Sequence, residues 1–485
     1  MSNDEDAHQL GDTDPAEFRA RLHQVADWIA DYREHIGERR ISPDVRPGAV
    51  AGALPSAAPF QPESLTAILK DLDRIIVPGL VHWGHPSFFG YFGSTTTAPG
   101  ILGEMIAAAL NVSAMTWRTS PAATELESVV LGWLRQMLQL SQHHQGIVYD
   151  TASVATLHAL AAARESIGHE VRRSGLAGRA DLPRLKVYAS DQAHSSVEKA
   201  AIALGLGEEN VTRVPTDDAF RIDPAALEAE ILKDMAHGHL PCAVVATVGT
   251  TSTTSVDPVD AIAAVCHKHR IWLHVDAAYG GAMALLPEGR WAMAGTDAAD
   301  SIVVNPHKWL FVPLDFSVLY TRRPEMLRAV FSLTPEYLRG DASANAENYM
   351  DYGIQLGRRF RALKAWMVFR AFGEEGMRAR IREHIRLARL LESWIAADPD
   401  FEMAAPVPMA VLCFSAKRPG AAAEDIDCLN ETIVREVNAS GDAYLTHTAV
   451  RGRTVIRLAI GNVLTTEAHV YACWELVRKI AARCT

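Results

Sequence analysis

The sequence predicts an α/β fold with a mainly parallel central sheet, and three observations support it. Short apolar runs alternate with longer helical stretches from residue 185 onwards, with runs at 185–188, 243–248, 271–275 and 301–304. A residue able to do chemistry follows each run: His194, Thr251, Asp276 and Lys308. Ligands of such sheets bind beyond the carboxyl ends of the strands. The sequence therefore predicts one shared site at that edge of the sheet.

The 485 residues are enough for two or three domains. We expect an N-terminal helical and extended arm over residues 1–95, a large ligand-binding domain over 96–365 and a small C-terminal α/β domain over 366–485. Apolar runs at 409–414 and 455–460 are the strands expected of the small domain.

Two amphipathic helices are expected in the arm. Asp14 and Pro15 supply an N-cap and a proline at the first helical position, and one apolar face follows through Phe18, Leu22, Val25, Ile29 and Tyr32. A Pro/Gly/Ala-rich connector over 41–62 precedes the second helix, over 65–76. Two helices on an extended arm have little core of their own, so they need another surface to pack on.

Composition excludes several classes of protein. Lys and Arg number 47 against 58 Asp and Glu, a net charge of −11, so nucleic-acid binding is disfavoured. Residues 1–14 lack the features of a signal peptide, and no stretch approaches the roughly 20 apolar residues that span a bilayer. Six scattered cysteines without C-x-x-C spacing indicate reduced thiols, and no histidine pair has a complete metal-ligand set nearby. We therefore expect a soluble, cytoplasmic protein without a metal site.

Lys308 is the residue with the most distinctive position. It follows the apolar run 301–304, where a buried strand should end, and a desolvated lysine loses its proton readily and becomes an amine nucleophile. Asp276 ends the preceding strand and can place a carboxylate opposite a pyridine nitrogen. A lone lysine after a strand usually has no such role, so the prediction rests on both residues.

An anion site is expected at residues 150–153. The apolar run 147–149 leads into small polar residues and then into an Ala/Leu-rich helix over 154–166. Unpaired backbone N–H groups and the helix dipole attract an anion at such a place. Ala152 and Ser153 are therefore predicted to hold a phosphate.

These residues resemble the group II pyridoxal-phosphate-dependent decarboxylases, and most closely the aromatic-L-amino-acid decarboxylases. The resemblance rests on the blocks 120–127, 191–198, 274–279, 305–310 and 356–361, and runs in order from about residue 83 to the C-terminus. It implies the PLP-dependent transferase-like fold (fold type I), pyridoxal 5'-phosphate as cofactor, and a homodimer with its active site at the subunit interface. The helical arm would then pack on the partner subunit.

The resemblance also implies roles for single residues. Lys308 would form the Schiff base with the cofactor, and Asp276 would keep the pyridine nitrogen protonated. His194 would stack on one ring face and Ala278 would lie against the other. The remaining cofactor contacts would be Ala152, Ser153, Thr251, Asn305 and His307.

A dense aromatic stretch over 81–93 should line the substrate pocket in this family. Its candidates are Trp83, Tyr91 and Phe92, joined by Met115 and Trp117 from the next segment. Arg118 departs from the small residue expected there; facing the pocket it would favour a carboxylate, and an exposed position is the alternative. Tryptophan, 5-hydroxytryptophan, DOPA, tyrosine, phenylalanine and histidine all stay open as substrates.

Residues 332–357 contain no convincing helix or strand, and in the resembled family this region is a loop that carries a catalytic tyrosine. Counting back from the 356–361 block gives Tyr349, with Tyr352 as the alternative. The resemblance implies that Tyr349 reaches in from the other subunit and donates a proton to the substrate carbon. A tyrosine here favours decarboxylation to the amine and CO2, whereas relatives with phenylalanine are aldehyde synthases. The expected function is decarboxylation of an aromatic L-amino acid; decarboxylation of an acidic or aliphatic amino acid, and aromatic aldehyde synthesis, are the alternatives.

Overall fold

A seven-stranded sheet forms the centre of the protein. The structure, a computed structural model, describes residues 12–333 and 346–484, and its sheet has the order β1-β7-β6-β5-β4-β2-β3. The strands are β1 (Gln145–Tyr149), β2 (Leu185–Ser190), β3 (Val211–Val214), β4 (Leu240–Thr247), β5 (Trp272–Asp276), β6 (Ser301–Val304) and β7 (Ser317–Thr321). Only β7, between β1 and β6, runs against the others in this described sheet. The predicted α/β fold with a mainly parallel sheet is confirmed.

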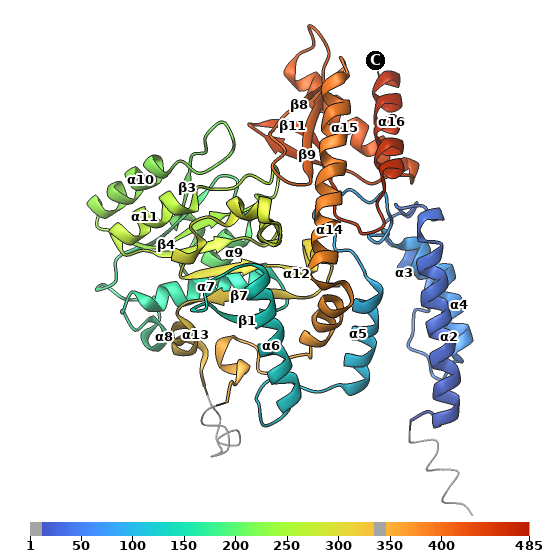
Figure 1. The fold of residues 1–485 in the computed structure, drawn as a ribbon, viewed down its shortest axis with the longest axis horizontal. Coiled ribbons are helices and arrows are strands. Elements are labelled where there is room, and N and C mark those ends of the chain that lie inside the picture. Colours follow the sequence, from blue (N-terminus) through green and yellow to red (C-terminus); the bar gives the residue numbers. More distant parts are fainter. Residues whose placement is uncertain (1–11, 334–345, 485) are drawn as a thin grey trace, which may run out of the picture.

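Helices cover both faces of this sheet (Figure 1). They are α5 (Ala98–Leu110), α6 (Pro121–Met137), α7 (Ala152–Ser166), α8 (Val171–Ser174), α9 (Ser196–Ala203), α10 (Pro224–Ala236), α11 (Val259–His269), α12 (Pro306–Trp309) and α13 (Pro324–Phe331). The predicted helix 154–166 is α7, which crosses β1, β4, β5, β6 and β7. Its buried face is mostly alanine, and these small side chains let the helix lie close to the strands.

A second, four-stranded antiparallel sheet lies in the C-terminal part. Its order is β10 (Thr446–Val450), β11 (Arg453–Ala459), β9 (Val411–Ala416) and β8 (Phe401–Met403), with α15 (Ala423–Ser440) and α16 (Glu467–Arg483) packed beside it. The long helix α14 (Ala362–Ala397) contacts α5 and α6 below and this sheet above (Figure 1). α14 crosses the predicted limit at residue 365 and has non-helical backbone angles only later, at Gly373. The three domain limits stay predictions.

The arm begins with α2 (Pro15–Glu34), where the Asp14 side chain accepts from the backbone N–H of Ala16, as the predicted N-cap requires. The predicted second helix is α4 (Leu65–Asp71) with a π-helical turn after it, and a short helix α3 (Ala49–Ala53) interrupts the expected connector. α2 and α4 lie together at one flank, away from the central sheet (Figure 1). No residue of α2 is buried, so its apolar face lacks a covering surface in the single chain.

No helix in the described part of the chain is both long and apolar enough to cross a membrane.

Buried neutral histidines make the fold sensitive to mild acid. His384 accepts from Trp309 Nε1 at Nδ1 (3.0 Å) and shares a 3.1 Å bond at Nε2 with the Asn462 carbonyl, so a neutral ring fits both partners. Burial lowers the pKa of His384 to about 4, and it does the same to His158 and His274. Because the folded pKa is below the unfolded value near 6.5, the stabilisation is complete above pH 6.5 and is lost as the pH falls towards 4.

We therefore expect the thermal midpoint to fall steadily between pH 7 and pH 5. Each of these histidines contributes a loss of roughly 2 kcal/mol in the free energy of unfolding over that interval. Surface carboxylates such as Glu288, whose pKa is lowered to about 2 by Arg382, titrate below it. Scanning calorimetry across this range is the measurement, and a midpoint that stays constant would contradict the assignment of neutral buried rings.

Candidate active site

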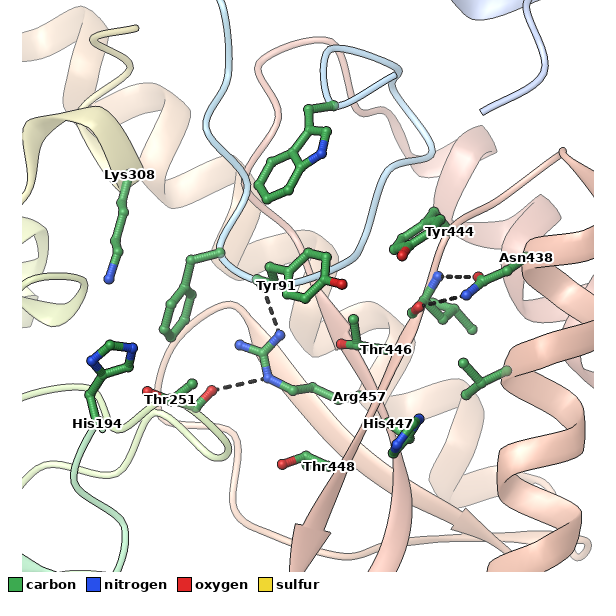
Figure 2. A pocket seen from close by; sticks show the side chains of 14 residues that line it. Tyr91, His194, Thr251, Lys308, Asn438, Tyr444, Thr446, His447, Thr448 and Arg457 are labelled. Carbon is green, nitrogen blue, oxygen red and sulfur yellow. Dashed lines mark hydrogen bonds between the residues drawn. The ribbon is translucent and has the colours of Figure 1, made fainter. Parts of the chain in front are cut away.

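Two adjoining cavities open beyond the carboxyl ends of the central strands. The smaller has a volume of about 180 Å³ and the larger about 570 Å³. Both are lined by Phe92, His194, Thr251 and Lys308, so the four residues lie at their junction. Figure 2 shows Lys308 and His194 on one side of the larger cavity and residues of the small sheet on the other. The predicted edge of the sheet therefore does carry a pocket.

Lys308 enters this junction from α12, the single turn that follows β6. Its Nζ lies 5.0 Å from the centre of the Phe92 ring. Burial lowers the pKa of Lys308, Arg457 lowers it further, and Asp276 partly opposes them. A lower pKa makes more of the neutral amine available at a given pH, so this lysine is suited to nucleophilic chemistry.

Asp276 ends β5 and lines the smaller cavity beside Lys308. Its Oδ1 accepts from the backbone N–H of Ala278 at 3.0 Å. Of the hydrogen bonds in the described structure, none occupies Oδ2. The carboxylate is therefore held by one oxygen while the other stays available to a ligand.

The N-terminus of α7 forms another wall of the smaller cavity, through Thr151, Ala152 and Ser153. Thr151 is the N-cap, and its Oγ1 accepts from Val154 N at 3.4 Å. The N-terminus of this fifteen-residue helix therefore borders the cavity, at the place where the sequence predicted a phosphate site.

Two histidines present the same ring nitrogen to the site. His194 Nδ1 accepts from Ser196 N at 3.1 Å, and His307 Nδ1 accepts from Phe316 N at 2.9 Å. In the neutral ring each Nε2 therefore carries the proton and can donate. Burial lowers the pKa of both, that of His307 to about 3, so both rings are neutral donors near pH 7.

The loops that meet over the site approach one another closely. Gly249 follows β4 with a φ of 88°, and a Cβ built there would lie 2.9 Å from Gly280 N. Only glycine combines that backbone conformation with so close a contact. The loop can then carry Thr251 to the cavity, while Tyr279 comes from the neighbouring loop.

Aromatic rings make up much of the wall. Tyr279 stacks between Phe92, at 4.0 Å between ring centres, and Trp309, at 4.7 Å. Further out, Trp83 and Tyr91 stack at 5.3 Å. Trp83, Tyr91 and Phe92, which the sequence singled out, all line the larger cavity.

Arg457 is a site residue that the sequence reasoning missed. It comes from β11, and its guanidinium lies over Phe92 while donating to the carbonyls of Thr251 (3.0 Å) and Tyr91 (2.7 Å) (Figure 2). Nη2 is buried without a hydrogen-bond partner in the described structure. The sequence offered one indication of this role. Arg457 lies inside the apolar run 455–460, and a charged residue in such a run is expected to be buried and paired with another group. Thr247 and Tyr279 also line the smaller cavity. The sequence gave no indication of this, apart from their positions near the predicted site residues.

Three predicted residues lie outside both cavities. Met115, Trp117 and Tyr349 form a separate group in which Met350 N donates to Met115 O and Trp117 N to the Asn348 side chain. Arg118 is exposed and lines neither cavity. These segments do not reach Lys308 of the same chain.

The role predicted for Tyr349, a proton donor that reaches in from the other subunit, stays a prediction. This tyrosine is 4% exposed, its hydroxyl shares a 2.8 Å hydrogen bond with Ser128, and Arg358 lies 4.7 Å over its ring. The alternative, Tyr352, is equally buried, and its hydroxyl donates to Glu347. Both belong to a 3-10 turn (Tyr349–Tyr352) inside the expected loop, and residues 334–345 of that loop lie outside the described residues. Neither tyrosine lines the two cavities beside Lys308 of the same chain.

Comparison with known proteins places this geometry in a family. The model of the pyridoxal-dependent decarboxylase conserved domain matches residues 47–417. The chain belongs to this family. It is 39% identical to the aromatic-L-amino-acid decarboxylase of Sus scrofa, with 96% of each chain covered. It is 38% identical to the phenylacetaldehyde synthase of a Rosa hybrid cultivar, over 96% of this chain and 94% of that one. The structure of Oryza sativa TDC with PLP and tryptamine matches with a TM-score of 0.93 and 38% identity, over 98% of this chain and 99% of that one.

The family relationship confirms the predicted resemblance, and the enzyme is a pyridoxal-phosphate-dependent amino-acid decarboxylase. The residues of the smaller cavity fit that cofactor. They offer an amine for its aldehyde, a carboxylate for its ring nitrogen and a helix N-terminus for its phosphate. Thr247 Oγ1 is buried in this cavity without a partner in the described structure, as expected for a wall that meets a polar ligand.

Proposed function

We propose that this decarboxylase acts on aromatic L-amino acids and releases the corresponding amine and CO2. The observation that carries the proposal is the larger cavity, which opens on Lys308 and is lined by Trp83, Tyr91 and Phe92. Stacked rings such as these bind a flat apolar side chain better than a carboxylate. The relatives named for aromatic substrates support the same substrate class.

In this proposal each residue around the two cavities has a separate role. Pyridoxal phosphate, when bound, supplies an electron sink for the pair left on carbon as CO2 departs. Lys308 binds the cofactor through its amine, and Asp276 holds a proton on the ring nitrogen. Ala152, Ser153 and His307 would hold the phosphate. Ala278 and His194 would lie on the two ring faces, and Thr251 and Asn305 at the ring edge.

The aromatic wall has a catalytic purpose of its own. Loss of CO2 requires the substrate to be held in one orientation, and the aromatic wall would grip its side chain for that purpose. Positioning of this kind supplies roughly 7–11 kcal/mol of a barrier. Phe92 contacts both Tyr279 and the Arg457 guanidinium, so its ring is fixed before the substrate arrives.

The test of substrate class is an amine assay by mass spectrometry on the loaded enzyme with L-amino acids in parallel. Tryptamine, dopamine, tyramine or phenethylamine should dominate. Turnover of only acidic or basic amino acids would refute the aromatic assignment. The same assay separates amine from aldehyde, and a dominant aldehyde would make the enzyme an aldehyde synthase like its rose relative.

The proposal includes a homodimer. Apolar side chains on α2 and α5 are exposed in the single chain, among them Phe18 at 57% and Leu102 at 51%, together with Ile106 and Leu110. A second copy covering these faces would also bring the group of Met115 and Trp117 towards a neighbouring pocket. The six free cysteines agree with a reducing, cytoplasmic location.

Charge on the α5 face should break the dimer. We expect the double variant Leu102→Glu, Ile106→Glu to sediment as a monomer and to lose at least about 10-fold in activity, because two carboxylates cannot be buried unpaired. Analytical ultracentrifugation is the measurement. The matched control is Ile202→Glu on α9, an exposed apolar residue outside α2 and α5. A wild-type enzyme that is itself monomeric would refute the dimer.

Replacing Tyr349 tests its predicted role as the proton donor. Tyr349→Phe removes the hydrogen bond to Ser128, so we expect a loss of about 1 kcal/mol in stability and amine as the main product still. Product analysis with thermal unfolding checks both. A shift to aldehyde would instead support Tyr349 as the proton donor. Tyr337→Phe, a position outside the described residues, examines the remaining tyrosine between 332 and 357.

A further inference from the structure

His274 is a buried histidine that none of the roles above uses. It lies on β5 two residues before Asp276, and its side chain is fully buried. Residues two apart on a strand share one face of the sheet. The imidazole therefore lies next to Asp276 on the same face, one step further from the pocket.

The bonds of His274 indicate where its ring proton lies. Trp272 Nε1 donates to Ser301 Oγ at 2.9 Å, and Ser301 Oγ lies 2.9 Å from His274 Nδ1. An indole nitrogen can only donate, so the hydroxyl accepts from Trp272 and keeps its own proton for an acceptor. His274 Nδ1 is the acceptor within reach, which leaves the ring proton on Nε2.

That Nε2 atom is buried and has no hydrogen-bond partner in the described structure. A buried N–H without a partner is rare in folded proteins, because it loses its hydrogen bonds to water and gains none within the protein. Burial lowers the pKa of His274 to about 4, although Asp276 opposes this, so the ring is neutral near pH 7. The unpaired group is therefore a neutral donor with a carboxylate on the same face beside it.

We propose that His274 is a positioning residue: its Nε2–H donates to the Asp276 carboxylate when the cofactor occupies the site, and fixes that carboxylate against the ring nitrogen. Ala278 N already holds Oδ1. A second donor restricts the remaining rotation of the group. The chain Trp272, Ser301, His274 then reaches from the middle of the sheet to the cofactor.

This inference rests on the role given to Asp276 under the proposed function. Its test compares His274→Asn with His274→Gln, because the Asn amide nitrogen reaches the position of Nδ1 and that of Gln reaches the position of Nε2. Three quantities are measured: the dissociation constant for pyridoxal phosphate, by fluorescence quenching of the cofactor-free protein; the visible spectrum of the loaded protein against pH; and kcat with KM separately.

We expect His274→Asn to weaken cofactor binding about 10-fold, the effect of losing a hydrogen bond to a charged group. Its spectral transition should shift and its kcat should fall with KM nearly constant, whereas His274→Gln should stay within about 3-fold of the wild type. Unchanged binding and spectrum in His274→Asn overturn the proposal, and so do equal losses in both variants, which indicate packing alone.

If His274→Asn does not fold, Ser301→Ala decides. That variant keeps the imidazole and removes the hydroxyl that holds Nδ1, so weaker cofactor binding with a shifted spectrum supports the proposal and unchanged values overturn it. Wild-type protein tested in parallel distinguishes a failure of the proposed function from a failure of the His274 proposal. If the wild type does not bind pyridoxal phosphate, the proposed function is refuted, and not only the role of His274.

Discussion

Replacing Lys308 by alanine should abolish amine formation, with a loss of at least about 1,000-fold in kcat, the scale expected when a group essential to the reacting centre is removed. The structure supplies the reason, because Lys308 is the lysine at the junction of the two cavities and its pKa is lowered by burial and by Arg457. The loss should appear in kcat and in cofactor retention after dialysis.

Lys308→Arg is the matched control for this experiment. An arginine keeps the positive charge and most of the length, but its guanidinium stays protonated and cannot act as a nucleophile. We expect it to be as inactive as the alanine variant. Activity within 10-fold of the wild type in the arginine variant would mean that Lys308 contributes charge alone, and the nucleophile would have to be sought elsewhere.

The second large effect is expected for Asp276→Asn, which keeps the shape of the side chain and removes its charge. Without a carboxylate opposite the ring nitrogen the cofactor no longer holds a proton there, so its capacity as an electron sink falls. We expect kcat to drop by at least roughly 100-fold, with a thermal midpoint near that of the wild type, because Oδ1 can still accept from Ala278 N. Steady-state kinetics and calorimetry on the same preparation check both.

Asp300→Asn provides the comparison for this variant. Asp300 accepts from Leu273 N at 2.9 Å and lies just before β6, at the edge of the sheet opposite to the end of β5 that carries Asp276. It lines neither of the two active-site cavities. Its replacement should affect stability but leave kcat unchanged. Full activity in Asp276→Asn, or an equal loss in both variants, would exclude the electron-sink role.

Most of what the sequence could predict about the site came from residues that follow the ends of predicted strands. The runs before Lys308 and Asp276 are mainly apolar, apart from Ser301 and His274, because parallel strands are buried on both faces, so their ends are sharp in the sequence. Residues that follow such ends meet at one edge of the sheet whatever the details of the loops between them. That is why Lys308, Asp276, His194 and Thr251 line one small cavity in the structure.

Contacts between distant segments were beyond this reasoning. Arg457 reaches the pocket from the small sheet, more than a hundred residues after Lys308, and nothing local predicts which loops its guanidinium binds. Tyr349 illustrates the opposite case. Its position was counted from the neighbouring 356–361 block, but its burial depends on Ser128 and Arg358, which only the folded chain brings beside it.

The most direct test of the central claim, that Lys308 holds the cofactor, is to reduce the loaded enzyme with borohydride and map the modified lysine by peptide mass spectrometry. A single pyridoxyl group on the peptide that contains Lys308 is the predicted result. Lys364 is a useful internal comparison, since it is also buried but is paired with Glu104. Modification at Lys364 or at another lysine, with Lys308 unlabelled, would contradict the assignment of the site.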